Sequence, residues 1–202
     1  MITYSVIALL VIVHILDYLV FPPKGVKRWS YSYLILGKQG NRGIQMGKHH
    51  TPFNKILCLN APAVRRGQLW RLVSYLFLHC GLFHLAGNCA ALWAMGSLME
   101  SQLGLWRYLL VLLASGLFVS LLSVIHYPAS EFGQGGSPAI YGALAILAIM
   151  RVREPQLLQA ISWPGRIYLL LYVLSNVVDP GSLYAHSYGF LAGIGLVFLF
   201  KI

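Results

Sequence analysis

The sequence predicts an all-α membrane protein, a bundle of six transmembrane helices with a short fourth helix at its centre. Hydrophobic residues make up 58% of the 202 residues and charged residues only 10%, a balance outside the range of soluble globular domains. The mean hydropathy is +0.70. Several apolar stretches are long enough to cross a bilayer, which takes about 20 residues per helix. The predicted spans form one domain over 1–202, with approximate limits 3–22, 70–98, 106–126, 137–150, 167–178 and 185–200.

The first span is expected to be a membrane anchor. It has no basic segment before it and no small-residue cleavage site, and Asp17 interrupts its far end, so it does not read as a signal peptide. The second and third spans, 70–98 and 106–126, are long apolar stretches separated by a short connection. The long connection 23–69 precedes them and contains nine Lys and Arg residues but no acidic residue.

The fourth span is expected to be too short to cross the membrane. Thirteen steps separate Ser137 from Met150, which is about 20 Å of helix against about 30 Å of hydrocarbon. The glycine-rich approach GQGGSPAIYG, 133–142, must therefore enter the bilayer. Irregular backbone at that depth is tolerated only where protein buries it or water reaches it, so we expect a sunken aqueous cavity at Ser137.

Polar side chains from two other spans are expected at the same depth. On the sixth span, His186 lies 15 residues before Lys201, and on the second, Asn88 and His84 lie 12 and 16 residues before Glu100. These separations correspond to heights of about 18–24 Å above one membrane face. Polar residues inside a membrane are functional hypotheses by default.

These residue types fit acyl-transfer chemistry. A nucleophilic serine, here Ser137, needs a base such as the neutral imidazole of His186, and the developing oxyanion needs hydrogen-bond donors. The i,i+4 spacing of His84 and Asn88 places both on one helix face. Tyr141 lies i,i+4 from Ser137.

Glycines are spaced for a close helix contact beside this group. Gly189 and Gly193 form a small-xxx-small face just after His186, and Gly142 offers a matching gap on the fourth span.

Structural interpretations compete with these functional ones. Ser137 followed by Pro138 is also an ordinary helix start, and a histidine inside a bundle is often a satisfied polar residue. His79 and His84 are i,i+5, about 140° apart on a helix, so no metal site is predicted. No cofactor is expected. The three scattered cysteines match neither a disulfide framework nor a zinc spacing. A nucleic-acid partner is not predicted, because so apolar a chain offers no soluble module to carry it.

Three motifs together resemble the rhomboid intramembrane serine proteases. WRLVSYLFLHCGLFHLAGN, 70–88, resembles the family's Trp-Arg and His-x-x-x-Asn motifs. GGSPAIYG, 135–142, is similar to its Gly-x-Ser motif with a downstream tyrosine, and AHSYGFLAG, 185–193, to its Ala-His-x-x-Gly-x-x-x-Gly motif. The order and spacing agree from about residue 70 to the end. One departure is Pro138, where the family usually has glycine.

The resemblance implies a rhomboid bundle and a role for each matching residue. Ser137 would be the nucleophile and His186 its general base, with His84 and Asn88 as oxyanion stabilisers. Supporting roles fall to three further residues: Tyr141, which would pack on the His186 ring, Gly135 and Gly189. Trp70 and Arg71 would brace the loop, and Glu100 would anchor the C-terminal end of the second span.

The implied activity is that of a serine endopeptidase. It would hydrolyse peptide bonds in or near transmembrane segments of other membrane proteins, with single-pass substrates and a small residue before the cut. Its surroundings are the lipid bilayer of the cell membrane. Two alternatives are a catalytically inactive rhomboid-like protein that binds membrane helices, and a channel or transporter. A channel or transporter would be expected to contain inverted repeats or paired broken helices.

Charge gives two opposing indications of orientation. Lys and Arg in short loops share one face, which by the positive-inside rule is cytoplasmic: Arg107, Arg151, Arg153, Arg166 and Lys201. The same topology puts the basic loop 23–69 outside, against the rule. The rhomboid resemblance favours a cytoplasmic N-terminus and an active site that opens to the non-cytoplasmic side, and we adopt that orientation as the prediction.

Overall fold

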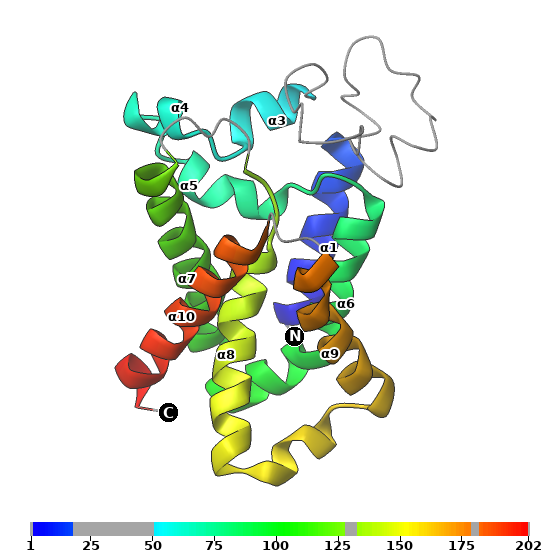
Figure 1. Ribbon diagram of the computed structural model, residues 1–202. Helices are drawn as coiled ribbons and strands as arrows, with labels where there is room; N and C mark the ends of the chain where they lie inside the picture. Colours follow the sequence, from blue (N-terminus) through cyan, green and yellow to red (C-terminus); the bar gives the residue numbers. More distant parts are fainter. Residues whose placement is uncertain (1, 18–50, 128–132, 179–181, 202) are drawn as a thin grey trace. The chain divides into compact units, whose positions relative to one another are not determined.

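The computed structural model describes residues 2–17, 51–127, 133–178 and 182–201, and this part of the chain is helical (Figure 1). Within these ranges there is no β-strand, only an isolated bridge between Leu59 and Gly133. The helices are α1 (Ile2–Ile15), α3 (Pro52–Leu57), α4 (Ala61–Arg65), α5 (Arg71–Ser74), η2 (Tyr75–Phe77), α6 (Leu82–Leu103), α7 (Leu105–His126), α8 (Ser137–Arg153), η3 (Pro155–Ala160), α9 (Trp163–Val178) and α10 (Leu183–Phe200).

Among the described residues, three helices are long and apolar enough to cross a membrane: α6, α7 and α10. The helix α1 is apolar but shorter, and α8 and α9 have 17 and 16 residues. The fold is therefore all-α with several membrane-crossing helices, while the count of six spans and the aqueous cavity stay predictions.

Local sequence explains where several helices begin and end. The helix α6 ends at Leu103, and the following Gly104 has a φ of +74°, in the left-handed region that glycine adopts readily, before α7 starts at Leu105. Pro138 is compatible with the first turn of α8, because the leading N–H groups of a helix have no intrahelical partner. Pro155 follows the end of α8 and excludes its continuation.

The range 70–98 is not the single span that the sequence led us to expect. Two short helices, α5 and η2, precede an extended residue, Leu78, and α6 begins only at Leu82. Side-chain hydrogen bonds hold this first part: the Ser74 hydroxyl donates to the Leu57 carbonyl oxygen over 2.6 Å. Apolar composition alone does not reveal such a break, because the residues on both sides of it are hydrophobic.

The chain forms two compact units. The first comprises the described parts of 1–7, 87–119 and 137–202, and the second those of 8–86 and 120–136. In the first unit every residue of α8 from Ser137 to Leu147 is buried, which is the behaviour of a helix surrounded by protein on all sides. In this unit α8 and α10 begin side by side and diverge toward their C-terminal ends (Figure 1).

Large apolar side chains are exposed along the outer helices, as expected for surfaces that face lipid. They include Leu110, Leu113, Leu117 and Phe118 on α7, Leu170, Leu171, Val173 and Leu174 on α9, and Leu191, Phe198 and Leu199 on α10.

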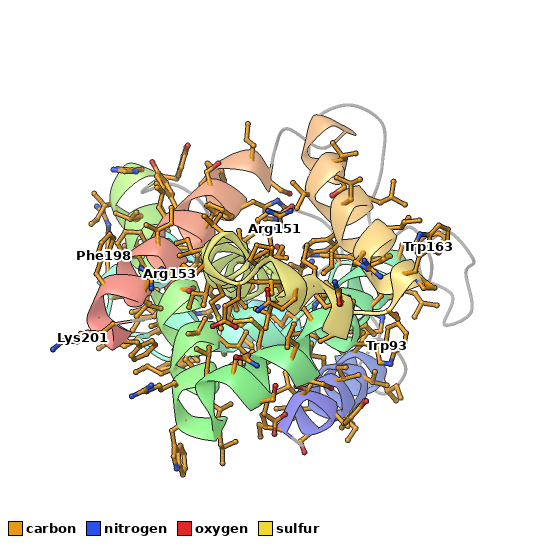
Figure 2. The ribbon with its side chains drawn as sticks, turned by 90° about the horizontal axis from the view of Figure 1, so that it is seen from below. Trp93, Arg151, Arg153, Trp163, Phe198 and Lys201 are labelled. Atoms are coloured by element: carbon orange, nitrogen blue, oxygen red, sulfur yellow. The ribbon has the colours of Figure 1, made fainter. Side chains whose placement is uncertain are left out.

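Basic residues gather at one end of the first unit. Arg151 and Arg153 lie in the last turn of α8, and Lys201 follows α10; Figure 2 looks onto this end. Near the start of α7, the guanidinium carbon of Arg107 lies 5.8 Å from the centre of the Phe200 ring, so it joins the same end.

Of the basic loop 23–69, only the part from Thr51 onward lies within the described residues. There α4 is capped by Asn60, whose side-chain oxygen accepts a hydrogen bond from the Ala63 N–H over 2.8 Å.

Candidate active site

Ser137 and His186 form a hydrogen-bonded pair in the first unit. Ser137 is the first residue of α8 and His186 lies in the first turn of α10, and the serine Oγ is 2.8 Å from the histidine Nε2. The serine side chain is buried, with 8% of its surface exposed. A serine hydroxyl at this distance from an imidazole nitrogen is the geometry that base-assisted nucleophilic attack requires.

Glycines allow the two helices to approach at this point. A Cβ atom at Gly189 would overlap the backbone of Pro138, and one at Gly193 would overlap the carbonyl of Gly142. Because backbone atoms cannot move aside cheaply, any larger residue at these positions would push α10 away from α8. The contact that the glycine spacing predicted is therefore present, and it begins at Pro138 and Gly189, next to Ser137 and one turn after His186.

Tyr141 stacks on the His186 ring. The ring centroids are 4.2 Å apart and the planes differ by 9°. The Tyr141 hydroxyl donates to the backbone carbonyl of Tyr172 on α9 over 3.0 Å, and the two tyrosine rings also stack, 5.4 Å apart. The imidazole is thus held from one side by a ring that is itself hydrogen-bonded to a third helix.

Asn88 lies on α6 and is almost fully buried, with 1% of its surface exposed. Its Oδ1 accepts a hydrogen bond from the Tyr172 hydroxyl over 2.7 Å. Tyr172 was not among the residues that the sequence singled out. One turn earlier on α9, the Tyr168 hydroxyl donates to the backbone carbonyl of Gly87, 2.8 Å away.

His84 lies in the first turn of α6, in the second unit, where Cys80, His79 and Gly135 lie against its ring. Its Nδ1 is 3.2 Å from the Sγ of Cys80, and its ring meets the His79 ring edge-on, with centroids 5.1 Å apart. A Cβ atom at Gly135 would stand 2.7 Å from His84 Cε1 and 3.0 Å from Nε2. Gly135 has φ +130° and donates to the Tyr75 carbonyl over 3.0 Å, so a side chain there would strain the backbone and displace the His84 ring.

The position of His79 corrects one step of the sequence argument. We placed His79 and His84 on one helix, about 140° apart, but His79 precedes α6 in a non-helical segment and its ring touches that of His84. In the described ranges, no three His, Cys, Asp or Glu side chains gather in a way that could hold a metal ion.

Arg71 and Trp70 brace the segment before α5 in the second unit. The Arg71 guanidinium donates to the carbonyl oxygens of Lys55 and Cys58 over 2.6 and 2.9 Å, and the Trp70 indole to that of Ile56 over 3.0 Å. Burial raises the pKa of the Cys58 thiol to about 11, although the nearby Arg71 opposes the shift. This thiol stays protonated at neutral pH and offers no competing nucleophile.

Glu100 ties the end of α6 to the start of α1. Its carboxylate accepts hydrogen bonds from the Ile2 N–H, over 2.9 Å, and from the N–H and hydroxyl of Thr3, each over 3.2 Å.

The residues predicted for the site thus fall into two groups. In the first unit, contacts link Ser137, His186, Tyr141, Gly189 and, through Tyr172, Asn88. In the second unit, His84 and Gly135 lie against each other.

Comparison with known proteins agrees with these motifs. The sequence model of the protein family described as Rhomboid domain matches residues 66–201 of this chain. The chain is 31% identical over 139 residues to the rhomboid protease GluP of Bacillus subtilis, an alignment that covers 66% of this chain and 27% of GluP. It is 29% identical over 138 residues to the putative rhomboid protease YdcA of the same organism, covering 67% of this chain and 69% of YdcA. With rhomboid-like protease 1 of Toxoplasma gondii the identity is 29% over 150 residues, covering 69% of this chain and 50% of the relative.

The described residues include helices long and apolar enough to cross a membrane, and Ser137 and His186 are hydrogen-bonded to each other. Together these features define a helical membrane protein with a serine–histidine pair. The chain belongs to the rhomboid family, which confirms the resemblance seen in the three motifs. It is accordingly a multi-pass membrane protein. It spans only about a quarter of GluP and half of the Toxoplasma relative.

Proposed function

We propose that this protein is an intramembrane serine endopeptidase that cleaves peptide bonds in or near transmembrane segments of other membrane proteins. The observation that carries the proposal is the 2.8 Å hydrogen bond between Ser137 Oγ and His186 Nε2 in a chain of the rhomboid family. Relatives in this family are named as proteases in bacteria and in Toxoplasma gondii.

In the proposed mechanism, Ser137 Oγ attacks the carbonyl carbon of the scissile peptide bond while its proton passes to His186 Nε2. The ring nitrogen must be unprotonated to accept, so the neutral imidazole carries its proton on Nδ1. Collapse of the tetrahedral intermediate breaks the C–N bond, and the imidazolium returns the proton to the leaving amine. A water molecule, deprotonated by the same histidine, then hydrolyses the acyl-enzyme.

The oxyanion of the intermediate needs donors where negative charge develops. We assign this role to the Asn88 amide, the His84 imidazole and the backbone N–H of Ser137. Tyr141 stacks on His186 and restricts its ring, and Gly189 brings α10 close enough for the pair to form. Gly135 leaves room for the His84 ring. The reaction needs no cofactor.

The membrane arrangement is proposed from the same unit. We infer six spans, with α8 as the short central helix in a water-accessible cavity, a cytoplasmic N-terminus and an active site that opens to the non-cytoplasmic side. Within the first unit, Ser137 and His186 lie at the N-terminal ends of two helices, and basic residues lie at their C-terminal ends: Arg151 and Arg153 in the last turn of α8 and Lys201 just after α10. A basic end favours the cytoplasmic face, which supports this orientation. Single-pass proteins with a small residue before the cut are the proposed substrates.

The test uses purified protein and a fluorophosphonate probe, which reacts covalently with an activated serine. We expect labelling of the wild type and none of Ser137→Ala or His186→Ala. Each variant should also fail to cleave a single-pass model substrate in proteoliposomes while remaining folded. The double variant should lose no more than either single one, because the pair acts as a unit. Cleavage by Ser137→Ala would refute the mechanism, and an unlabelled, inactive wild type would favour a non-catalytic helix-binding protein.

A further inference from the structure

Tyr172 of α9 contacts Asn88, a member of the proposed oxyanion site whose amide has two chemically opposite edges. An asparagine amide has an acceptor, Oδ1, on one edge and a donor, the Nδ2 amino group, on the other. Only the donor edge can stabilise an oxyanion. The Tyr172 hydroxyl donates to Asn88 Oδ1 over 2.7 Å, so the acceptor edge is occupied by a residue 84 positions away in the sequence.

We propose that Tyr172 is a positioning residue that fixes the Asn88 amide with its Nδ2 group directed at the developing oxyanion. The proposal rests on the proposed function. The terminal torsion of asparagine is broad and roughly two-fold, so the Cβ–Cγ bond alone does not distinguish the two amide orientations. A hydroxyl that donates to Oδ1 does distinguish them, because the reversed amide would set two donors against each other unless the hydroxyl also turned.

The surroundings of Tyr172 make its hydroxyl well placed for this task. Its backbone carbonyl accepts the Tyr141 hydroxyl, and its ring stacks on the Tyr141 ring, which in turn covers His186. The tyrosine is therefore held at three points, by its ring, its backbone and its hydroxyl. Tyr172 connects the general base of the proposed mechanism with the proposed oxyanion donor through direct contacts within the first unit.

Phenylalanine at this position removes only the hydroxyl. In Tyr172→Phe the backbone carbonyl and the ring remain, so the contacts with Tyr141 are kept. The Asn88 amide then loses the Tyr172 hydroxyl, which favours one of its two orientations, and a fraction of the molecules presents oxygen instead of N–H to the oxyanion. We expect kcat to fall at least about 5-fold, and by less than in Asn88→Ala, because complete loss of such a donor typically costs about 100- to 1000-fold. KM should change little.

The chain supplies a matched control in Tyr168→Phe. This residue lies one turn earlier on the same helix, and its hydroxyl also donates to α6, but the acceptor is the backbone carbonyl of Gly87. Both variants remove one tyrosine hydroxyl and one hydrogen bond between α9 and α6. Only Tyr172→Phe touches the Asn88 side chain, so a loss of general helix packing would lower the activity of both.

The experiment measures kcat and KM for cleavage of a single-pass model substrate in proteoliposomes by four proteins: Tyr172→Phe, Tyr168→Phe, Asn88→Ala and the Tyr172→Phe/Asn88→Ala double variant. The proposal expects a lower kcat for Tyr172→Phe and a nearly unchanged one for Tyr168→Phe. In the Asn88→Ala background, Tyr172→Phe should have no further effect, because no amide remains to be oriented.

Two results would overturn the proposal while leaving the proposed function intact: equal kcat values for the two tyrosine variants, or a full additional loss from Tyr172→Phe in the Asn88→Ala background. Failure of the proposed function has a different signature, a wild type that is neither labelled by fluorophosphonate nor able to cleave, and that control is measured first.

Discussion

Replacement of Gly189 by alanine tests whether the contact between α8 and α10 holds the Ser137–His186 pair together. A Cβ atom at Gly189 would stand 3.0 Å from the carbonyl carbon and the Cα of Pro138, and closer still to the carbonyl oxygen. Ordinary carbon–carbon contacts are about 3.5–4.0 Å. The two helices must therefore separate locally by about 0.5–1 Å, because the obstructing atoms belong to the backbone.

Such a shift matters because the pair starts at 2.8 Å and hydrogen bonds weaken beyond about 3.2 Å. A displacement of about 1 Å at a reacting group can cost about 100-fold in rate, so we expect kcat of Gly189→Ala to fall about 10- to 100-fold. Overpacking should also lower the free energy of unfolding by about 1–3 kcal/mol. The measurements are substrate cleavage and fluorophosphonate labelling in the same detergent, together with thermal unfolding.

Gly195→Ala is the matched control on the same helix. A Cβ atom at Gly195 would meet nothing within 4 Å, and alanine is favoured over glycine inside helices by about 0.5–1 kcal/mol. This variant should keep the wild-type kcat and unfold at the same or a higher temperature. If Gly189→Ala matched it in both kcat and stability, the close approach of α8 and α10 would not be what positions the pair.

Two further predictions concern the second unit and the membrane orientation. Cys80→Ala removes the thiol that lies next to His84 Nδ1, and this nitrogen must accept a hydrogen bond if the neutral ring is to donate from Nε2. We expect kcat of Cys80→Ala to fall about 2- to 10-fold, which corresponds to a net hydrogen bond of about 0.5–1.5 kcal/mol. Cys80→Ser keeps a donor and should keep most of the activity, and equal kcat values for wild type and Cys80→Ala would contradict the prediction. A cysteine that replaces the exposed Arg66 should react with a membrane-impermeant maleimide in intact cells. A cysteine that replaces the exposed Gln156 should react only after the cells are lysed. The reverse pattern would put the active site on the cytoplasmic side. Maleimide labelling of the chain without either substitution is measured as the baseline.

Periodicity and spacing were enough to predict the helices that carry Ser137 and His186, although not the break before Leu82 within the expected span 70–98. The helix α8 begins at Ser137, as expected, and the close approach of α10 follows from the small-xxx-small spacing of Gly189 and Gly193. These features are local: each depends on residues within a few turns of one helix and on the absence of a side chain at defined positions. The family follows from the three motifs and is confirmed by the Rhomboid domain match.

Features that depend on distant residues could not be predicted in this way. The hydrogen bond from Tyr172 to Asn88 joins residues 84 positions apart, and nothing in an apolar helix rich in tyrosine distinguishes Tyr172 from Tyr168. The residues before the break at Leu82 include Arg71, whose guanidinium donates to the Cys58 carbonyl oxygen, 13 positions away in the sequence. That break also brings the ring of His79 against that of His84, where an uninterrupted helix would have turned His79 away.

The order of the contacts in the first unit suggests how the site is held ready before a substrate arrives. A buried polar group without a partner costs free energy, and here each polar side chain is hydrogen-bonded to, or stacked on, the next. Asn88 accepts from Tyr172, Tyr172 accepts from and stacks on Tyr141, and Tyr141 covers His186, which contacts Ser137. The same contacts that satisfy these groups also restrict their rotation. A replacement anywhere along this series should therefore alter the geometry at its neighbours as well, so that stability and activity change together in this unit, whereas a replacement on the lipid-facing side of α9 or α10 should change neither.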